Sequence, residues 1–236
     1  MNRIKSLIKG RNLETLNDQM KIPSVSIIVL AAIILMCVFA GLIAPYTSAD
    51  MDSSALDQAP SFSHIFGTDT LGRDLFSMIL YGGRISIYIG ILATLISTAI
   101  AVVYGCISGL AGERIDDIMM RFTELVMSIP AILLIIFLQA VLGDPTPTSI
   151  AVVIGVTHWM AISKMVRSEV RQIGKNDFVL AARTMGAGFF YIMKNHLAPN
   201  FISPIMFMVV MNISAAIGTE ATLSFLGLGL PLTTVS

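Results

Sequence analysis

The sequence predicts an all-α membrane protein, a polytopic bundle of transmembrane helices. Apolar residues make up 55% of the 236 residues and charged residues only 13%, whereas a typical soluble domain has about 25% charged residues. Apolar stretches of about 20 residues also recur, long enough to cross a bilayer as helices with internally paired backbone groups. The composition therefore argues against a soluble enzyme, and the balance of 15 basic and 15 acidic residues argues against nucleic acid as a partner.

Five apolar segments are predicted to cross the membrane. The first carries no charge and is too long for the apolar region of a cleaved signal peptide, which has about 7–15 residues. The third and fifth contain Pro130 and Pro204, where the helix can kink if neighbours satisfy the freed carbonyl. The fourth relies on Lys164 to reach the headgroups. The expected spans are Val25–Ala44, Ser86–Gly112, Leu125–Leu142, Thr148–Met165 and Phe201–Thr219.

The distribution of lysine and arginine predicts the orientation of these spans. Counted along the chain, alternate segments between the spans hold thirteen basic residues against two. The richer set is expected to face the cytoplasm. The N-terminus and the basic segment 164–200 are therefore predicted to be cytoplasmic.

Segment 164–200 is predicted to form short helices separated by glycines. Val166, Val170 and Ile173 recur at helical spacing, and further helices are expected over Phe178–Met185 and Phe189–His196. The segment has two possible roles, an amphipathic hairpin at the headgroups or a docking surface for a cytoplasmic partner. Docking is favoured by the apolar side chains expected to be exposed, namely Phe178, Val179, Phe189, Phe190 and Ile192.

Within this segment, FVLAARTMGAGFFYIMKNHLAPN resembles the EAA loop of type I ABC importer permeases. The matching positions are Ala181, Ala182, Gly186 and Pro199. The chain departs from the motif at Leu180, His196 and Ala198, where the family has Glu, Ile and Leu.

A second stretch, HIFGTDTLGRDLFSMILYGGRISIYIG, closely resembles the segment before the second span in dipeptide, oligopeptide and nickel permeases of this superfamily. The matching residues are Gly67, Thr68, Asp69, Gly72, Arg73, Asp74, Ser77, Gly82, Arg84 and Ser86. MRFTELVMSIP and LSFLGLG resemble the same family. The chain is thus identified as similar to the second, shorter permease of the pair.

This resemblance implies a permease subunit of an ATP-driven ABC importer in the bacterial plasma membrane, carrying peptides or nickel. The implied partners are a second homologous permease, two ATP-binding subunits and an extracytoplasmic solute-binding protein. ATP hydrolysis is expected on the separate subunits, so the chain is expected to have no catalytic residue and no cofactor. Two alternatives remain open: an ion-coupled secondary carrier acting alone, and a non-transporting scaffold or truncated remnant.

The resemblance also implies a division of the chain. The family has six spans, so the expected five-span chain looks C-terminally truncated. The expected parts are a cytoplasmic segment 1–24, a first transmembrane helix 25–44, an extracytoplasmic loop with an interfacial helix 45–85, a permease core 86–219 containing the coupling loop 164–200, and an extracytoplasmic tail 220–236.

The motif before the second span has two interpretations. Asp69, Arg73 and Asp74 either touch substrate or a binding protein, or they cap an interfacial helix predicted over Leu71–Tyr81. Capping is the simpler explanation.

Three other features are candidates. Gly105 and Gly109 form a small-residue pair of the kind that allows close helix packing. Glu220 is either a functional carboxylate inside the membrane or lies at the interface. His158 could meet a metal on a nickel pathway, but a single histidine is not a metal site, and none is expected.

Overall fold

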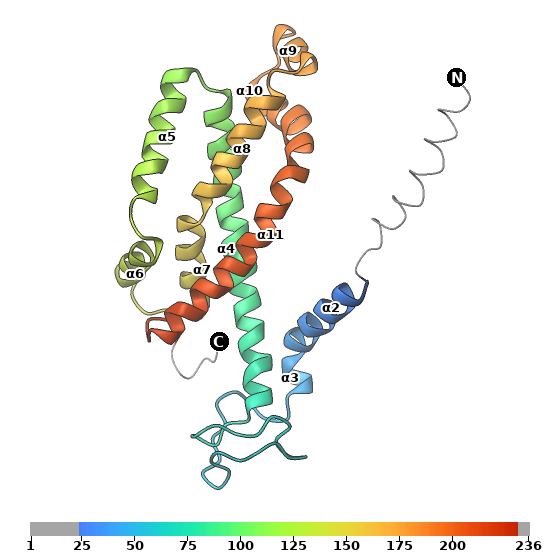
Figure 1. Ribbon diagram of the computed structural model, residues 1–236, viewed down its shortest axis with the longest axis vertical. Helices are drawn as coiled ribbons and strands as arrows, with labels where there is room; N and C mark the ends of the chain where they lie inside the picture. Colours follow the sequence, from blue (N-terminus) through green and yellow to red (C-terminus); the bar gives the residue numbers. More distant parts are fainter. Residues whose placement is uncertain (1–23, 231–236) are drawn as a thin grey trace, which may run out of the picture.

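The computed structural model describes residues 24–230, and this part of the chain is helical without a β-strand (Figure 1). The all-α prediction is confirmed. The helices are α2 (Ser24–Val38), α3 (Ala40–Ile43), α4 (Leu75–Leu110), α5 (Glu113–Met127), α6 (Ala131–Leu142), α7 (Pro147–Thr157), α8 (Trp159–Ile173), α9 (Asp177–Thr184), α10 (Phe189–Ile192), the π-helical turn η1 (Met193–Leu197) and α11 (Ala198–Phe225).

Helix α4 is the central element of the bundle and packs against α7, α8 and α11. It has 36 residues, and no proline interrupts the sequence from Leu75 to Leu110. The separate interfacial helix predicted over Leu71–Tyr81 is therefore wrong. Residues from Leu75 onward are the first turns of α4, and Asp74 is its N-cap.

Gly105 and Gly109 lie on the face of α4 that meets α8. A Cβ added to Gly105 would stand 2.7 Å from the Ser163 carbonyl oxygen, and one added to Gly109 would stand 2.7 Å from Val170 Cγ1. The close packing predicted for this glycine pair is confirmed.

Two of the candidate spans are broken. Between α5 and α6 the direction changes by 86°, next to Pro130, which has no N–H to donate and restricts the residue before it. Between α7 and α8 it changes by 43° at His158. Helix α8 continues to Ile173 since Val166 and Val170 are buried against α4, so the fourth predicted span and the start of segment 164–200 form one bent unit.

The first predicted span, Val25–Ala44, consists of α2 and α3 with a break at Phe39. In Figure 1 this pair leans away from the bundle, and among the described residues its main contacts are with α4. Its apolar side chains are largely exposed, for example 73% for Val25 and 85% for Leu42. Such a surface is suited to lipid or to another membrane helix.

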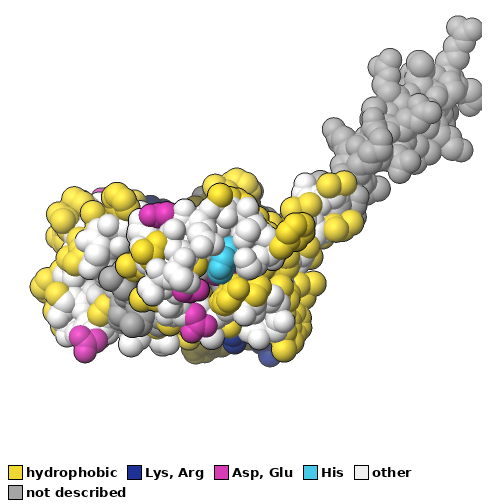
Figure 2. All heavy atoms as spheres, turned by 90° about the horizontal axis from the view of Figure 1, so that it is seen from below, with side chains coloured by type: hydrophobic (Ala, Val, Ile, Leu, Met, Phe, Trp, Pro, Cys, Tyr) yellow, Lys and Arg dark blue, Asp and Glu magenta, His cyan; other side chains and the backbone are white. Residues whose placement is uncertain are grey.

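By length and composition, two helical stretches in residues 24–230 can cross a membrane, Leu75–Leu110 and Phe189–Phe225. The number rises to four if each bent pair counts as one span, and the apolar α2 is shorter. Figure 2 shows hydrophobic side chains around the sides of the molecule and acidic side chains on the face seen from below. The protein is a multi-pass membrane protein.

Candidate functional site

Helix α9 forms the tip of the bundle at the end opposite the loop that precedes α4 (Figure 1). It ends in a left-handed residue, Gly186, with a φ of 83°. The N–H of Ala187 donates to the Ala182 carbonyl at 3.0 Å, a Schellman C-cap. A Cβ at Gly186 would meet no atom within 4 Å, so backbone conformation, and not space, favours glycine.

A cavity of about 460 Å³ opens beside this C-cap. The ring of His196 lies 5.9 Å from the ring of Phe178 and 5.7 Å from that of Tyr191, and the exposed Met185 stands at the edge. The tip of the bundle therefore presents an aromatic and apolar recess. Its lining residues are Phe178, Ala182, Met185, Gly186, Ala187, Gly188, Tyr191 and His196.

The apolar surface predicted for this segment is only partly exposed. Phe178 and Phe190 are exposed at 43% and 77%, but Val179 and Ile192 are buried, and Phe189 is half-buried. The exposure of Val179 and Ile192 was wrongly predicted because both side chains join the core shared by α8 and α11.

The four residues that match the coupling motif are not all brought together. Ala182 and Gly186 line the recess beside α9, whereas Ala181 is exposed. Pro199 is exposed in the first turn of α11, directly after the π-helical turn η1. Their role in coupling remains a prediction.

Sequence reasoning missed an ionic cluster that joins α4, α5 and α8. Asp116 on α5 is 1% exposed and accepts hydrogen bonds from Ser108 on α4 and from the Arg167 guanidinium on α8. Arg171 Nη2 lies 2.6 Å from Asp116 Oδ2. Asp116 and Arg167 are 51 residues apart, so periodicity within one helix gave no signal for this pair.

The motif in the loop before α4 has a structural role for each of its charged residues. Asp69 accepts hydrogen bonds from the backbone N–H groups of Leu71 and Arg73 and from the Arg73 Nε at 2.8 Å. Burial alone would raise the pKa of Asp69, but these hydrogen bonds outweigh it and hold the pKa below its ordinary value.

Asp74 caps α4. Its carboxylate accepts from the backbone N–H of Ser77 at 2.8 Å and from the Ser77 hydroxyl, and it lies 3.0 Å from His64 Nδ1. Burial opposes ionisation, but these partners together lower the pKa of Asp74. The predicted capping role holds for α4 itself.

Two glycines and a threonine close this loop. A Cβ at Gly67 would lie 2.3 Å from the Gln58 carbonyl oxygen and one at Gly72 2.0 Å from the Asp52 carbonyl oxygen. Both glycines have φ above 70°, a conformation that costs other residues free energy. Thr68 accepts a hydrogen bond from the Gln58 N–H at 2.9 Å. The six matching residues that precede α4 are thus brought together in one folded loop: Gly67, Thr68, Asp69, Gly72, Arg73 and Asp74.

Glu220 is buried inside the bundle, and α11 continues past it to Phe225. Its carboxylate is buried at 1% exposure and accepts from Ser224 at 2.9 Å and from Ser86 of α4 at 3.3 Å. Both interpretations of Glu220 from the sequence, a functional carboxylate inside the membrane and a position at the membrane interface, remain predictions. The Ser86–Glu220 hydrogen bond joins the interior of α4 to the C-terminal part of α11.

Within residues 24–230, no group of three or more His, Cys, Asp or Glu side chains is placed to hold a metal ion. His158 lies at the α7–α8 bend. Cys37 and Cys106 are both buried and free.

Comparison with known proteins gives matches over most of the chain. Residues 101–236 match the family described as binding-protein-dependent transport system inner membrane component. Residues 21–60 match the N-terminal TM domain of oligopeptide transport permease C.

Individual relatives cover the same region. The chain is 38% identical over 211 residues to the oligopeptide transport system permease protein OppC of Bacillus subtilis, covering 89% of the chain and 69% of the relative. It is 38% identical over 210 residues to the dipeptide transport system permease protein DppC of Bacillus subtilis (89% and 65%). It is 35% identical over 206 residues to OppC of Haemophilus influenzae (86% and 66%). The chain therefore spans about two thirds of the length of these relatives.

Proposed function

Because the chain belongs to the family of inner membrane components of binding-protein-dependent transport systems, we propose that it is a permease subunit of an ATP-driven importer of peptides. It is a multi-pass protein of the bacterial inner membrane. The observation that carries the proposal is the 38% identity to oligopeptide and dipeptide permeases over 89% of the chain.

We propose peptides, and not nickel, as the transported solute. The relatives described above are named for oligopeptide and dipeptide transport. When a separate binding protein selects the solute, the permease itself needs no metal ligands. His158 alone does not make a metal site. Nickel therefore has no observation in its favour.

The proposed partners are a second homologous permease, two ATP-binding subunits and an extracytoplasmic solute-binding protein. Helix α9 and its recess are the proposed contact with an ATP-binding subunit. The recess offers Phe178, Met185 and Tyr191 at the tip of the bundle, the kind of exposed apolar surface that marks a contact site. The excess of basic residues in alternate segments supports a cytoplasmic position for this tip.

The packing explains how a movement of α9 would reach the spans. Val179 of α9 and Ile192 of α10 are buried in one core with Val170 of α8 and Phe201 of α11. Helix α8 in turn touches α4 at Gly105. Because packed cores deform little, displacement of α9 by a partner would shift α8 and α11 together. Nucleotide in the ATP-binding subunits would bias this two-state movement.

The proposal is tested by replacing Gly186 by valine and comparing Gly188→Val. Gly186 has a φ of 83°, whereas Gly188 has a φ of −74° and also has no atom within 4 Å of an added Cβ. Gly186→Val should distort the C-cap of α9, while Gly188→Val should not. The assay is peptide uptake and peptide-stimulated ATP hydrolysis by the complex purified through a tag on this chain and reconstituted in proteoliposomes.

We expect Gly186→Val to lower stimulated ATP hydrolysis and uptake while the chain still inserts, and Gly188→Val to retain most of both. Wild-type activity of Gly186→Val would contradict the role of α9, whereas equal loss in both variants would assign the effect to the side chain added in the recess and not to the C-cap. Peptide uptake by the chain alone without ATP would instead establish a secondary carrier. A complex that assembles but moves no peptide would favour a non-transporting scaffold.

A further inference from the structure

A second cavity lies where both broken spans bend. It has a volume of about 370 Å³, within the range of about 300–1,000 Å³ typical of small-ligand sites. Pro130 at the α5–α6 break and His158 at the α7–α8 break line it, together with Asn212 and Ala215 of α11. Broken helices at membrane depth are tolerated where they line a cavity.

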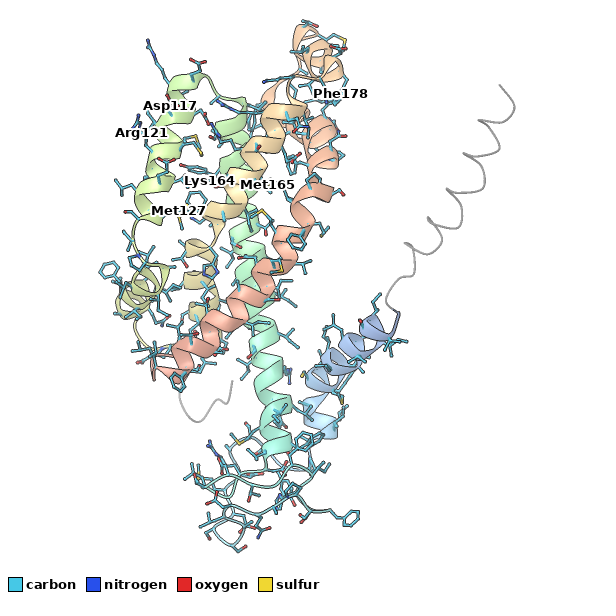
Figure 3. All side chains as sticks on the ribbon, viewed as in Figure 1. Asp117, Arg121, Met127, Lys164, Met165 and Phe178 are labelled. Carbon is cyan, nitrogen blue, oxygen red and sulfur yellow. The ribbon has the colours of Figure 1, made fainter. Side chains whose placement is uncertain are left out.

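The arm made by α5 and α6 is fixed at its two ends and bends at the cavity. At one end Asp116 is held by Arg167 and Arg171 of α8. At the other, α6 packs against α7 and Gln139 Nε2 donates to the Ser149 hydroxyl at 3.3 Å. In Figure 3, Met127 at the lower end of α5 marks the start of the bend, across from α8. The helices α5 and α6 on this side of the cavity are thus held in place by α8 and α7.

The lining is apolar except for a few uncharged polar side chains, and it contains no Asp, Glu, Lys or Arg. Thr157 donates to the carbonyls of Val153 and Ile154, and Asn212 Nδ2 donates to Ser97 of α4 at 2.7 Å. His158 differs, because its Nδ1 is buried without a hydrogen-bond partner in residues 24–230. A buried polar atom without a partner is costly and calls for an explanation.

We propose that this cavity binds an uncharged stretch of peptide, with His158 as the side chain that hydrogen-bonds to the peptide main chain. This inference rests on the proposed function and names a solute contact for it. Peptide N–H and C=O groups are polar without being charged, which fits a cavity that has polar atoms and no ionic partner. Because Nδ1 is buried, this hydrogen bond requires the imidazole ring to rotate until Nδ1 faces the cavity that His158 lines. The remaining apolar lining, including Met127 and Met160, takes apolar side chains of varied shape.

The first test uses two cysteine variants, Ala215→Cys and Ala221→Cys, in the complete complex in proteoliposomes. Both alanines are exposed on α11, but only Ala215 lines the cavity. The native Cys37 and Cys106 are buried, and the wild-type chain gives their background labelling. Penta-alanine during transport should slow maleimide labelling at position 215 at least about threefold and leave position 221 unchanged.

The second test compares His158→Leu with His158→Asn. Leucine removes both ring nitrogens, whereas the asparagine amide keeps a polar group near the position of Nδ1. Loss of one hydrogen bond to a desolvated peptide should raise the half-maximal penta-alanine concentration for uptake about tenfold in His158→Leu. His158→Asn should stay within about threefold of wild type.

The outcomes separate this inference from the proposed function. Equal labelling of the Ala215→Cys variant with and without penta-alanine, in a complex that does import it with ATP, overturns the cavity assignment and leaves the importer intact. That result counts even if His158→Leu does not fold, since the cysteine variants keep His158. A complex that imports no peptide with ATP overturns both.

Discussion

Replacing Gly105 by alanine tests the closest approach of α4 and α8. The added Cβ would stand 2.7 Å from the backbone carbonyl oxygen of Ser163 and 2.7 Å from Val166 Cβ, where ordinary contact begins at 3.4 Å. Neither atom lies at the far end of a flexible side chain, so the two helices must separate to make room. Gly218 of α11 is the matched control, because a Cβ there would meet nothing within 4 Å.

The two substitutions should change the free energy of unfolding in opposite directions. Both glycines lie inside helices, where alanine is favoured over glycine by about 1 kcal/mol. Overpacking a tight contact costs about 1–3 kcal/mol, and the immobile Ser163 carbonyl places Gly105→Ala toward the upper part of that range. We therefore expect Gly105→Ala to lose about 1–2 kcal/mol net and Gly218→Ala to gain up to about 1 kcal/mol.

The measurement is equilibrium unfolding of the purified chain by SDS in mixed micelles, followed by far-UV circular dichroism. A stability loss of about 1.4 kcal/mol changes the folded-to-unfolded ratio tenfold, which such titrations resolve. If Gly105→Ala stabilises the chain as much as Gly218→Ala does, α4 and α8 are farther apart than described and the packing argument fails.

Three further predictions concern charges and turns. Asp116→Asn should lower the free energy of unfolding by about 1–2 kcal/mol. This cost is smaller than the cost of breaking a fully buried ion pair, because the arginine partners of Asp116 are partly solvated. Gly72→Ala should open the loop before α4 to proteolysis, since the new Cβ would stand 2.0 Å from a carbonyl oxygen. Acidification should open the same loop. The pKa of Asp69 and of Asp74 is lowered by folding, so their stabilisation is complete above about pH 4 and is lost as the pH falls through the lowered values.

Each of these has a matched comparison. Asp117→Asn replaces the exposed neighbour of Asp116 and should change stability by less than about 0.5 kcal/mol. Gly143→Ala has a positive φ but no atom within 4 Å, so it should cost only the backbone strain, about 1–3 kcal/mol. Asp69→Asn should weaken the acid sensitivity of the loop. Unchanged proteolysis of the wild-type loop between pH 6 and pH 3 would refute the assigned role of these carboxylates.

Hydropathy predicted which segments form apolar helices, because burial in lipid depends on composition summed over about 20 residues. It did not predict where helices join or break. The separation expected between Leu71–Tyr81 and the second span is absent because Gly82 and Gly83 are tolerated within α4. Pro130 was expected to kink one helix, and the chain instead turns by 86° there.

The features of the candidate site that could be predicted are those that depend on residues close together in the sequence. The positive φ of Gly186 and the capping by Asp74 follow from residue type and spacing near a helix end. The contacts of Asp116 with Arg167, and the burial of Val179 and Ile192, depend on how distant helices pack. The cavity beside His158 likewise forms only when two bends and α11 meet.

The length of α4 has a mechanical consequence. Its 36 residues extend for about 54 Å at 1.5 Å per residue, well beyond an apolar bilayer core of about 30 Å. The loop before α4 is fastened to its first turn by Asp74, by the Leu75 N–H on the Gly67 carbonyl, and by the Tyr46 N–H on Ser77. A tilt of α4 by about 10° about its Leu110 end would therefore displace that loop sideways by about 9 Å.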